Sequence, residues 1–275
     1  MKGKGGALIV MTGGGSGGHI TPVLAVAHQV KLLAPGVKVV YIGQKGDALA
    51  DVPAADANID EVYQVRAGKF RRYHGEGVIR QLFDIPTVAK NIRDAFYVVA
   101  GIFQSWRLLR RLRPQVVFVK GGFVGVPVGV AAGWLNIPLV THDSDAIPGL
   151  ANRMVSRWAT VHAVALPKEI YNYPADKTVT VGVPISHNFS VQTAEQQQKT
   201  RQRLGLDADQ QVIVVTGGGL GAARLNEAVL AMAPDLLWSY GKVVIVHLTG
   251  RLHAEDISKK YNDVLTPEGR QRVRV

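Results

Sequence analysis

Short apolar runs rich in β-branched residues recur along the first two thirds of the chain. Such nearly continuous runs are typical of strands buried on both faces of a parallel sheet. Segments with helical spacing of apolar residues lie between several of them. The predicted strands are Ala7–Met11, Val37–Ile42, Val116–Val119, Leu139–His142, Val161–Ala165 and Val179–Gly182, and the predicted helices include Pro22–Leu33, Val126–Leu135 and Leu150–Arg157. This alternation predicts a doubly wound, Rossmann-like α/β domain over residues 1–186.

A polar stretch without strand signals follows, and we expect residues 187–210 to form a linker. The opening order of strand, glycine turn and helix then returns after Gln211. Lys242–Leu248 is the next predicted strand, and His253–Tyr261 is the next predicted helix. Residues 211–275 are therefore expected to begin a second Rossmann-like domain, which we expect to be truncated because a doubly wound domain usually has more strands.

The stretch from Ile85 to Leu112 has the pattern of one long helix, with Asp84 and Pro86 as start signals and Pro114 as the stop. One apolar stripe on such a helix is ordinarily its core-facing side. Here the stripe carries aromatic residues and the helix ends in an arginine cluster, which favours contact with an anionic lipid surface. The stripe comprises Ile85, Val88, Ile92, Phe96, Val99, Phe103, Trp106 and Leu109. The expected membrane-contact residues are Phe96, Phe103, Trp106, Arg107, Arg110 and Arg111.

Charge is concentrated in the same region. The 275-residue chain has a net charge of +11, and between Arg66 and Arg113 eleven basic residues face three acidic ones. Such a block indicates an anionic partner, either a membrane surface or a nucleic acid. No recognised nucleic-acid module accompanies it, so we expect no nucleic-acid partner.

Composition narrows the picture further. The sequence contains no cysteine, which excludes disulfides and thiolate chemistry within it. No stretch approaches the roughly 18 uninterrupted apolar residues of a spanning helix, and the first apolar run is too short for the core of a signal peptide.

The most informative motif is Gly13-Gly-Gly-Ser-Gly-Gly-His19, between the first predicted strand and helix. Glycines let backbone N–H groups converge on an anion at a helix N-terminus, which predicts a phosphate cradle. The alternative is a tight turn that binds nothing. The next predicted strand leads into Gln44 rather than an acidic residue, which counts against a dinucleotide enzyme. His19 could remove a proton from a hydroxyl group, or it could be a packing or capping histidine.

Two further glycine turns strengthen the prediction. Gly121-Gly-Phe-Val-Gly-Val-Pro127 follows a strand of the same sheet, and Thr216 to Asn226 repeats the first arrangement. Between them, Thr141-His-Asp-Ser-Asp145 could suggest a metal site. Aspartates at a strand end more often cap the following helix, so we expect no metal.

Five stretches resemble, in order, motifs of the MurG family of peptidoglycan glycosyltransferases, glycosyltransferase family 28. They are Gly13-Gly-Gly-Ser-Gly-Gly-His-Ile-Thr-Pro-Val-Leu-Ala-Val-Ala27, Gly121-Gly-Phe-Val-Gly-Val-Pro127, His142-Asp-Ser-Asp-Ala-Ile-Pro-Gly-Leu-Ala-Asn152, Val181-Gly-Val-Pro-Ile185 and Gly217-Gly-Gly-Leu-Gly-Ala-Ala-Arg-Leu-Asn226. The resemblance covers essentially the whole chain. It implies a GT-B fold, in which two Rossmann-like domains with parallel sheets bind the lipid-linked acceptor and the nucleotide sugar respectively.

The resemblance also implies a function. The family moves N-acetylglucosamine from UDP-N-acetylglucosamine to undecaprenyl-pyrophosphoryl-muramyl-pentapeptide, with inversion and without a cofactor. Such an enzyme would be peripheral at the cytoplasmic face of the bacterial plasma membrane and would serve cell-wall synthesis, cell shape and division. His19 matches the family's candidate base. The matched substrate-binding residues are Ser16, Gly17, Gly18, Phe123, Asp145, Ser186, Gly218, Gly219, Leu220 and Gly221.

Several of these positions depart from the family pattern. The family's Tyr is Phe123, its Asn residues are Val183 and Asp145, its Arg is Ser186, and its Ser and Gln are Gly219 and Leu220. The changes remove donors that would hold a charged nucleotide and add a carboxylate near a phosphate ligand. An alternative is therefore a non-catalytic, membrane-associated acceptor-binding half of a split glycosyltransferase, with a partner chain supplying the rest of the donor domain.

Overall fold

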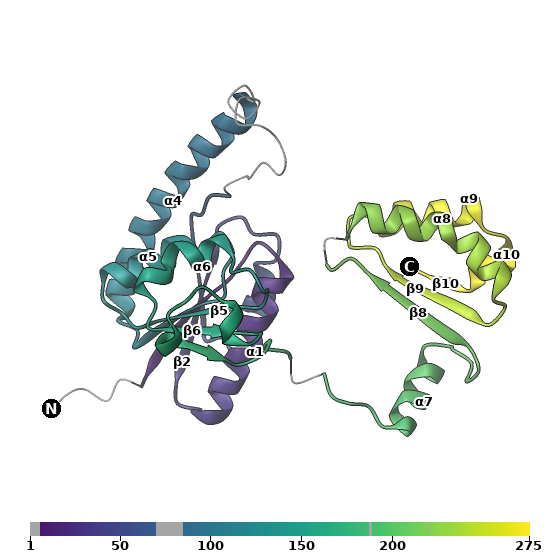
Figure 1. Cartoon of the computed structure of the whole chain (residues 1–275), viewed down its shortest axis with the longest axis horizontal. Coiled ribbons are helices and arrows are strands. Elements are labelled where there is room, and N and C mark those ends of the chain that lie inside the picture. Colours follow the sequence, from purple (N-terminus) through teal and green to yellow (C-terminus); the bar gives the residue numbers. More distant parts are fainter. Residues whose placement is uncertain (1–5, 70–84, 187–188, 220) are drawn as a thin grey trace. The chain divides into compact units, whose positions relative to one another are not determined.

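The computed structural model describes residues 6–69, 85–186, 189–219 and 221–275 (Figure 1). The chain divides into two compact units, Met1–Asn188 and Phe189–Val275, and each is described by itself. Among the described residues, no helix combines the length and the apolar character needed to cross a membrane.

The first unit is built on a seven-stranded sheet with the order β3-β2-β1-β4-β5-β6-β7. All neighbouring strands are parallel, which confirms the predicted doubly wound fold. The strands are β1 (Leu8–Thr12), β2 (Lys38–Gln44), β3 (Glu61–Val65), β4 (Val116–Val119), β5 (Leu139–Asp143), β6 (Val161–Val164) and β7 (Thr178–Thr180). The predictions missed β3. It lies at the edge of the sheet and is only partly buried, so its sequence lacks a continuous apolar run.

Helices cover the sheet on both faces, and alternate strand residues enter different cores. Val10 packs in the core that contains Leu109 of helix α4 (Ile85–Leu112), whereas Met11 packs in the core that contains Val23 of helix α1 (Gly17–Leu33). This two-sided burial explains why the strands read as apolar runs. The helices are α1 (Gly17–Leu33), α2 (Asp51–Ala54), α4 (Ile85–Leu112), α5 (Gly125–Trp134) and α6 (Leu150–Val155), with short 3₁₀ turns at Ser156–Trp158, Lys168–Ile170 and Ala175–Lys177.

Helix α4 has the predicted bounds and packs along α5. It ends where Arg113 adopts a left-handed φ of 52° and donates its backbone N–H to the Leu109 carbonyl over 2.8 Å. Pro114 then prevents continuation. The start signal at Asp84 lies outside the described residues.

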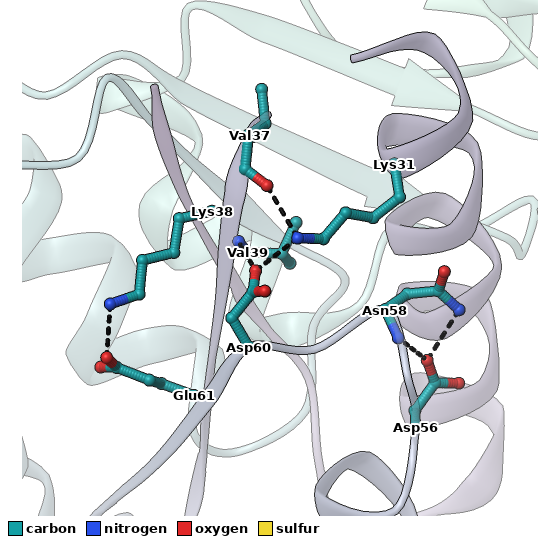
Figure 2. A network of polar contacts seen from close by, with 8 residues as sticks. All are labelled: Lys31, Val37, Lys38, Val39, Asp56, Asn58, Asp60 and Glu61. Carbon is teal, nitrogen blue, oxygen red and sulfur yellow. Dashed lines mark hydrogen bonds and ion pairs between the residues drawn. The ribbon is translucent and has the colours of Figure 1, made fainter. Parts of the chain in front are cut away.

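An ionic network fastens the edge strand β3 to β2 and α1 (Figure 2). The Asp60 carboxylate accepts from the Val39 backbone N–H and from the Lys31 ammonium, each over 2.6 Å. Lys31 also donates to the Val37 carbonyl over 2.8 Å, and Lys38 pairs with Glu61. These bonds fix the strand that the sequence did not reveal.

The second unit has a three-stranded parallel sheet with the order β10-β9-β8. One face packs against helices through residues such as Val229 and Ile245, while Val214 on the opposite face of β8 is 60% exposed. The elements are α7 (Ala194–Arg203), β8 (Gln211–Thr216), α8 (Ala223–Ser239), β9 (Val243–Leu248), α9 (Ala254–Val264), α10 (Pro267–Gln271) and β10 (Val273–Arg274).

The stretch expected to be a linker contains α7. A capping box begins this helix: the Thr193 hydroxyl accepts from the Gln196 backbone N–H, and the Gln196 side chain accepts from the Thr193 backbone N–H. The Thr-x-x-Gln spacing carried this signal, which the linker prediction overlooked.

Candidate active site

Two glycine turns meet where the strand order of the first sheet reverses. β1 pairs with β2 on one side and β4 on the other, so the turns that follow β1 and β4 leave from adjacent strand ends. A Cβ atom on Gly122 would lie 2.3 Å from the carbonyl oxygen of Gly14. The turns therefore touch backbone to backbone, at the position where open α/β sheets bind ligands.

The first turn is held by a carboxylate that sequence reasoning missed. Gly15 has a φ of 81° and donates its backbone N–H to the Asp47 carboxylate over 2.8 Å. The same carboxylate accepts from the Leu49 backbone N–H over 3.0 Å. Asp47 lies three residues after the end of β2, beyond Gln44 where an acidic residue was sought. It anchors the turn.

Helix α1 begins at Gly17, five residues before the predicted start at Pro22. Ser16 is the N-cap residue, and its side chain makes no capping hydrogen bond. Gly17 and Gly18 are exposed in the first helical turn. His19 therefore lies in the first turn of the helix and not in a loop, which corrects the predicted position. The first N–H groups of a helix have no intrahelical acceptor and can bind an anion.

A cavity of about 260 Å³ opens beside these turns. It is lined by ends of β4 and β5, the second glycine turn and the start of α6. Of the predicted residues in the first unit, His19, Phe123 and Asp145 line it, whereas Ser16, Gly17, Gly18 and Ser186 do not. Other lining residues include Lys120, Gly121, Gly122, His142, Asp143 and Asn152.

The imidazole of His19 has an environment that favours its neutral form. Burial lowers the pKa of His19 below its ordinary 6.5, and the positive charge of Lys120 lowers it further. Asp145 and Asp143 oppose this shift. The ring lies against the second glycine turn, since a Cβ atom on Gly121 would be 3.4 Å from its Cε1 atom. His19 can therefore accept a proton near neutral pH.

Asp143 is fully engaged by neighbouring donors. One carboxylate oxygen accepts from the Gly149 backbone N–H over 3.0 Å and from the Asn152 amide over 2.9 Å. The other accepts from the Tyr173 hydroxyl over 3.0 Å. Gly149 is the N-cap residue of α6, so Asp143 anchors the start of that helix, in keeping with the capping role expected of aspartates here.

Aromatic side chains pack beside the hydrogen-bonded Asp143. Tyr173 stacks on His162 with ring centroids 3.9 Å apart and planes 3° apart. The Nδ1 atom of His162 is 2.8 Å from the Thr141 hydroxyl. His142 is buried and contacts the Gly182 carbonyl through Nε2 over 3.0 Å. Gly182 belongs to the Val181–Ile185 motif, so that motif reaches the site through a backbone carbonyl.

The glycine turn of the second unit is also well defined. Gly218 and Gly221 have φ values of 79° and 78°. A Cβ atom on Gly221 would lie 2.0 Å from the Thr249 carbonyl oxygen, whereas Gly219 has open space around it. Leu220 lies outside the described residues. Buried Asn226 fixes the following helix, with its amide donating to the Thr249 carbonyl over 3.0 Å.

The apolar stripe of α4 points largely away from the core. Phe96 is 70% exposed and Phe103 is 59% exposed, whereas Leu109 is fully buried. The core-facing explanation is therefore wrong for most of the described stripe. Phe103 stacks with Trp106, and the guanidinium of Arg110 lies 5.1 Å from the Trp106 ring centroid. A second cavity, of about 370 Å³, lies here and is lined by Val99, Ile102, Phe103, Trp106 and Trp134.

The parallel sheets and glycine turns define an α/β protein of the GT-B type. Residues 9–164 match the glycosyltransferase family 28 N-terminal domain, and the chain belongs to this family.

Named relatives agree with this assignment. A UDP-N-acetylglucosamine--N-acetylmuramyl-(pentapeptide) pyrophosphoryl-undecaprenol N-acetylglucosamine transferase from Lachnospira eligens is 36% identical over 253 residues, covering 90% of this chain and 64% of the relative. A transferase of the same name, numbered 3, from Bacillus thuringiensis is 37% identical over 250 residues, with the same coverages of 90% and 64%. The chain thus spans about 64% of the length of these curated relatives.

Solved structures agree as well. This chain is 28% identical in sequence to the crystal structure of Acinetobacter baumannii MurG, with a TM-score of 0.59. The match covers 94% of this chain and 65% of the MurG chain. The structure of a putative UDP-N-acetylglucosamine 2-epimerase from Listeria monocytogenes matches 98% of this chain and 68% of the epimerase chain, with a TM-score of 0.62 and 12% sequence identity. This match shows a likeness of fold alone. The resemblance to the MurG family is therefore confirmed.

Proposed function

We propose that this protein transfers N-acetylglucosamine from UDP-N-acetylglucosamine to undecaprenyl-pyrophosphoryl-N-acetylmuramyl-pentapeptide in peptidoglycan synthesis. The observation that carries the proposal is the placement of His19, a partly buried imidazole with a lowered pKa, beside two touching glycine turns and a cavity. The names of the two relatives from Lachnospira eligens and Bacillus thuringiensis support this donor and this acceptor.

The chemistry requires a base next to an acceptor hydroxyl. The hydroxyl oxygen attacks the anomeric carbon of the sugar while the bond from that carbon to UDP breaks, which inverts the centre. His19 takes the hydroxyl proton, and UDP leaves with the bonding electrons. The neutral imidazole that burial favours is the form that this step needs.

The diphosphates are assigned to glycine turns. Ser16, Gly17 and Gly18 present a hydroxyl and exposed backbone at the start of α1, which suits an anionic group of the acceptor. We assign the donor diphosphate to the turn of the second unit, with Gly218, Gly219 and Gly221, and with Leu220 by position. We keep Phe123, Asp145 and Ser186 as substrate-binding residues, the first two because they line the cavity.

The exposed face of α4 is assigned to the membrane. Phe96 and Phe103 would insert apolar rings at the interface, and Trp106 would lie at the headgroup level. Arg107, Arg110 and Arg111 are exposed on the same helix and would attract anionic lipid. The protein would then be peripheral at the cytoplasmic face of the plasma membrane, where the lipid-linked acceptor is anchored.

The test uses the full-length gene product with radiolabelled UDP-N-acetylglucosamine and the lipid-linked acceptor. We expect label on the lipid and a fall in kcat of about 10²- to 10⁴-fold for His19→Ala. His28→Ala, on the same helix but away from the cavity, is the matched control and should retain the wild-type rate.

Folded protein that never labels the lipid would refute the proposal. Labelling that requires a separate second chain would instead favour the split-enzyme alternative. Wild-type kcat in His19→Ala would remove His19 from the base role.

A further inference from the structure

Lys120 is a buried lysine at the end of β4. It follows β4 directly and donates its backbone N–H to the Thr12 carbonyl over 2.9 Å, at the adjoining ends of β4 and β1. The residue is only 4% exposed and lines the cavity. Lysines are almost never buried to this degree unless they are paired.

Within the described part of the chain, the Lys120 ammonium has neither an ion pair nor a hydrogen bond. The two carboxylates that favour its charge are Asp143 and Asp145. Both oxygens of Asp143 already accept hydrogen bonds from Gly149, Asn152 and Tyr173. Asp145 is exposed to solvent, where its attraction is weakened.

The surroundings of Lys120 match the chemistry of a phosphate. The next two residues, Gly121 and Gly122, form the second glycine turn with φ values of 111° and 77°. Glycines in such conformations leave backbone N–H groups open to an oxyanion. Burial lowers the pKa of Lys120, and Asp143 and Asp145 oppose that shift. The ammonium form beside such a turn offers the point-charge contact by which lysine binds phosphate.

We propose that Lys120 is an acceptor-binding residue whose ammonium contacts a phosphate oxygen of the acceptor diphosphate in this cavity. The inference rests on the proposed function and assigns a new contact within it. In the sequence, Lys120 is marked only by its place, as a cation directly before the glycine pair at a strand end.

The contact has a consequence for His19. The charge of Lys120 is among the causes that lower the His19 pKa. A phosphate that compensates this charge removes part of that effect, so anion binding raises the pKa of His19. Acceptor binding would thereby make the imidazole a stronger base at the moment it is needed.

The test measures binding of inorganic pyrophosphate to this chain by calorimetry. Lys120→Met should weaken binding by about tenfold to a hundredfold, the loss expected for one charge-assisted contact. Lys45→Met is the matched control, because Lys45 is exposed and lines a neighbouring cavity with Arg66 and Lys69. It should change the affinity by less than about twofold, as expected of an exposed charge.

Parallel titrations with inorganic phosphate and with succinate separate phosphate chemistry from carboxylate chemistry. Succinate that binds as tightly as pyrophosphate would overturn the assignment to a phosphate. Equal losses in Lys120→Met and Lys45→Met would also overturn it, since they would indicate general attraction to a basic surface.

A second measurement needs no variant. The pKa of His19, followed by NMR of labelled histidine, should rise when pyrophosphate is added to the wild-type chain. An unchanged value at saturating pyrophosphate would refute the contact even if Lys120→Met does not fold. Pyrophosphate binding through Lys120 without sugar transfer by the full-length protein would refute the proposed function, and with it the acceptor assignment, while Lys120 would remain a phosphate-binding residue.

Discussion

Gly14 and Gly122 are in backbone contact, although 107 residues lie between them in the chain. A Cβ atom on Gly122 would lie only 2.3 Å from the Gly14 carbonyl oxygen. The contact joins the turn after β1 to the turn after β4. It sets how closely the start of α1, with His19, approaches Lys120 and the cavity.

We expect Gly122→Ala to destabilise the first unit. The new methyl group would collide with the Gly14 backbone, and the φ of 77° is unfavourable for alanine. Together these effects should lower the free energy of unfolding by about 2–4 kcal/mol. Urea denaturation would measure the loss. Gly17→Ala is the control for stability, because a Cβ atom there meets nothing within 4 Å; equal losses in both variants would contradict the contact.

The midpoint of the acidic limb of the pH–rate profile should lie below pH 6.5. Burial and the charge of Lys120 lower the pKa of His19, so the imidazole stays neutral and active to lower pH than a free histidine. Asp145 raises this pKa, and Asp145→Asn should therefore move the limb to still lower pH. The profile of kcat/KM for the full-length protein would measure both. A limb that moves upward in Asp145→Asn would contradict the assignment of His19 as the base.

Stability should decline as the pH falls below 6.5. Burial lowers the pKa values of His142, His162 and His247 in the folded chain. Below about pH 6.5 the unfolded chain then binds more protons than the folded one. The contribution of these neutral histidines to the free energy of unfolding is therefore fully present above about pH 6.5, and it is lost as the pH falls toward their pKa values in the folded chain. Urea midpoints between pH 7.5 and 5 would show this slope. His162→Gln should flatten it, and a slope of equal size in that variant would exclude His162 as a contributor.

Tyr173→Phe should reveal the value of the bond to Asp143. Removing the hydroxyl leaves one oxygen of a buried carboxylate without its donor, at a cost of about 1–3 kcal/mol in unfolding free energy. Tyr171→Phe is the comparison, because the Tyr171 hydroxyl donates to the backbone carbonyl of Asp145, which carries no charge, over 3.0 Å. Its loss should be smaller. A larger loss in Tyr171→Phe would show that the charge of Asp143 does not set the cost.

Binding to anionic vesicles should depend on the α4 face. Replacing Phe96 and Phe103 with serine should reduce binding at least about tenfold, because two exposed rings lose their burial in the lipid interface. Leu33→Ser removes a side chain that is 85% exposed on α1 and should have no effect. Co-sedimentation with phosphatidylglycerol vesicles would measure both variants, and an equal loss in each would contradict a specific membrane face.

Local patterns in the sequence predicted most of the first unit correctly. Apolar runs predicted six of its strands, and the stop at Pro114 together with apolar periodicity predicted α4 over its full length. These features succeed because buried parallel strands and long helices leave strong periodic signals. β3 and α7 escaped prediction because an edge strand and an exposed helix need little apolar surface.

The sequence by itself determined the glycine turns, the His19 imidazole next to one of them, and the family. Those features are short and contiguous, so they are visible without coordinates. Only the tertiary structure decided that the α4 stripe faces outward, that Asp47 holds the first turn and that Lys120 is buried beside His19. The first depends on which side of α4 packs against α5. The other two depend on residues far apart in the chain, which parallel crossover connections bring to the same edge of the sheet, and burial at that edge then sets the charges of the site.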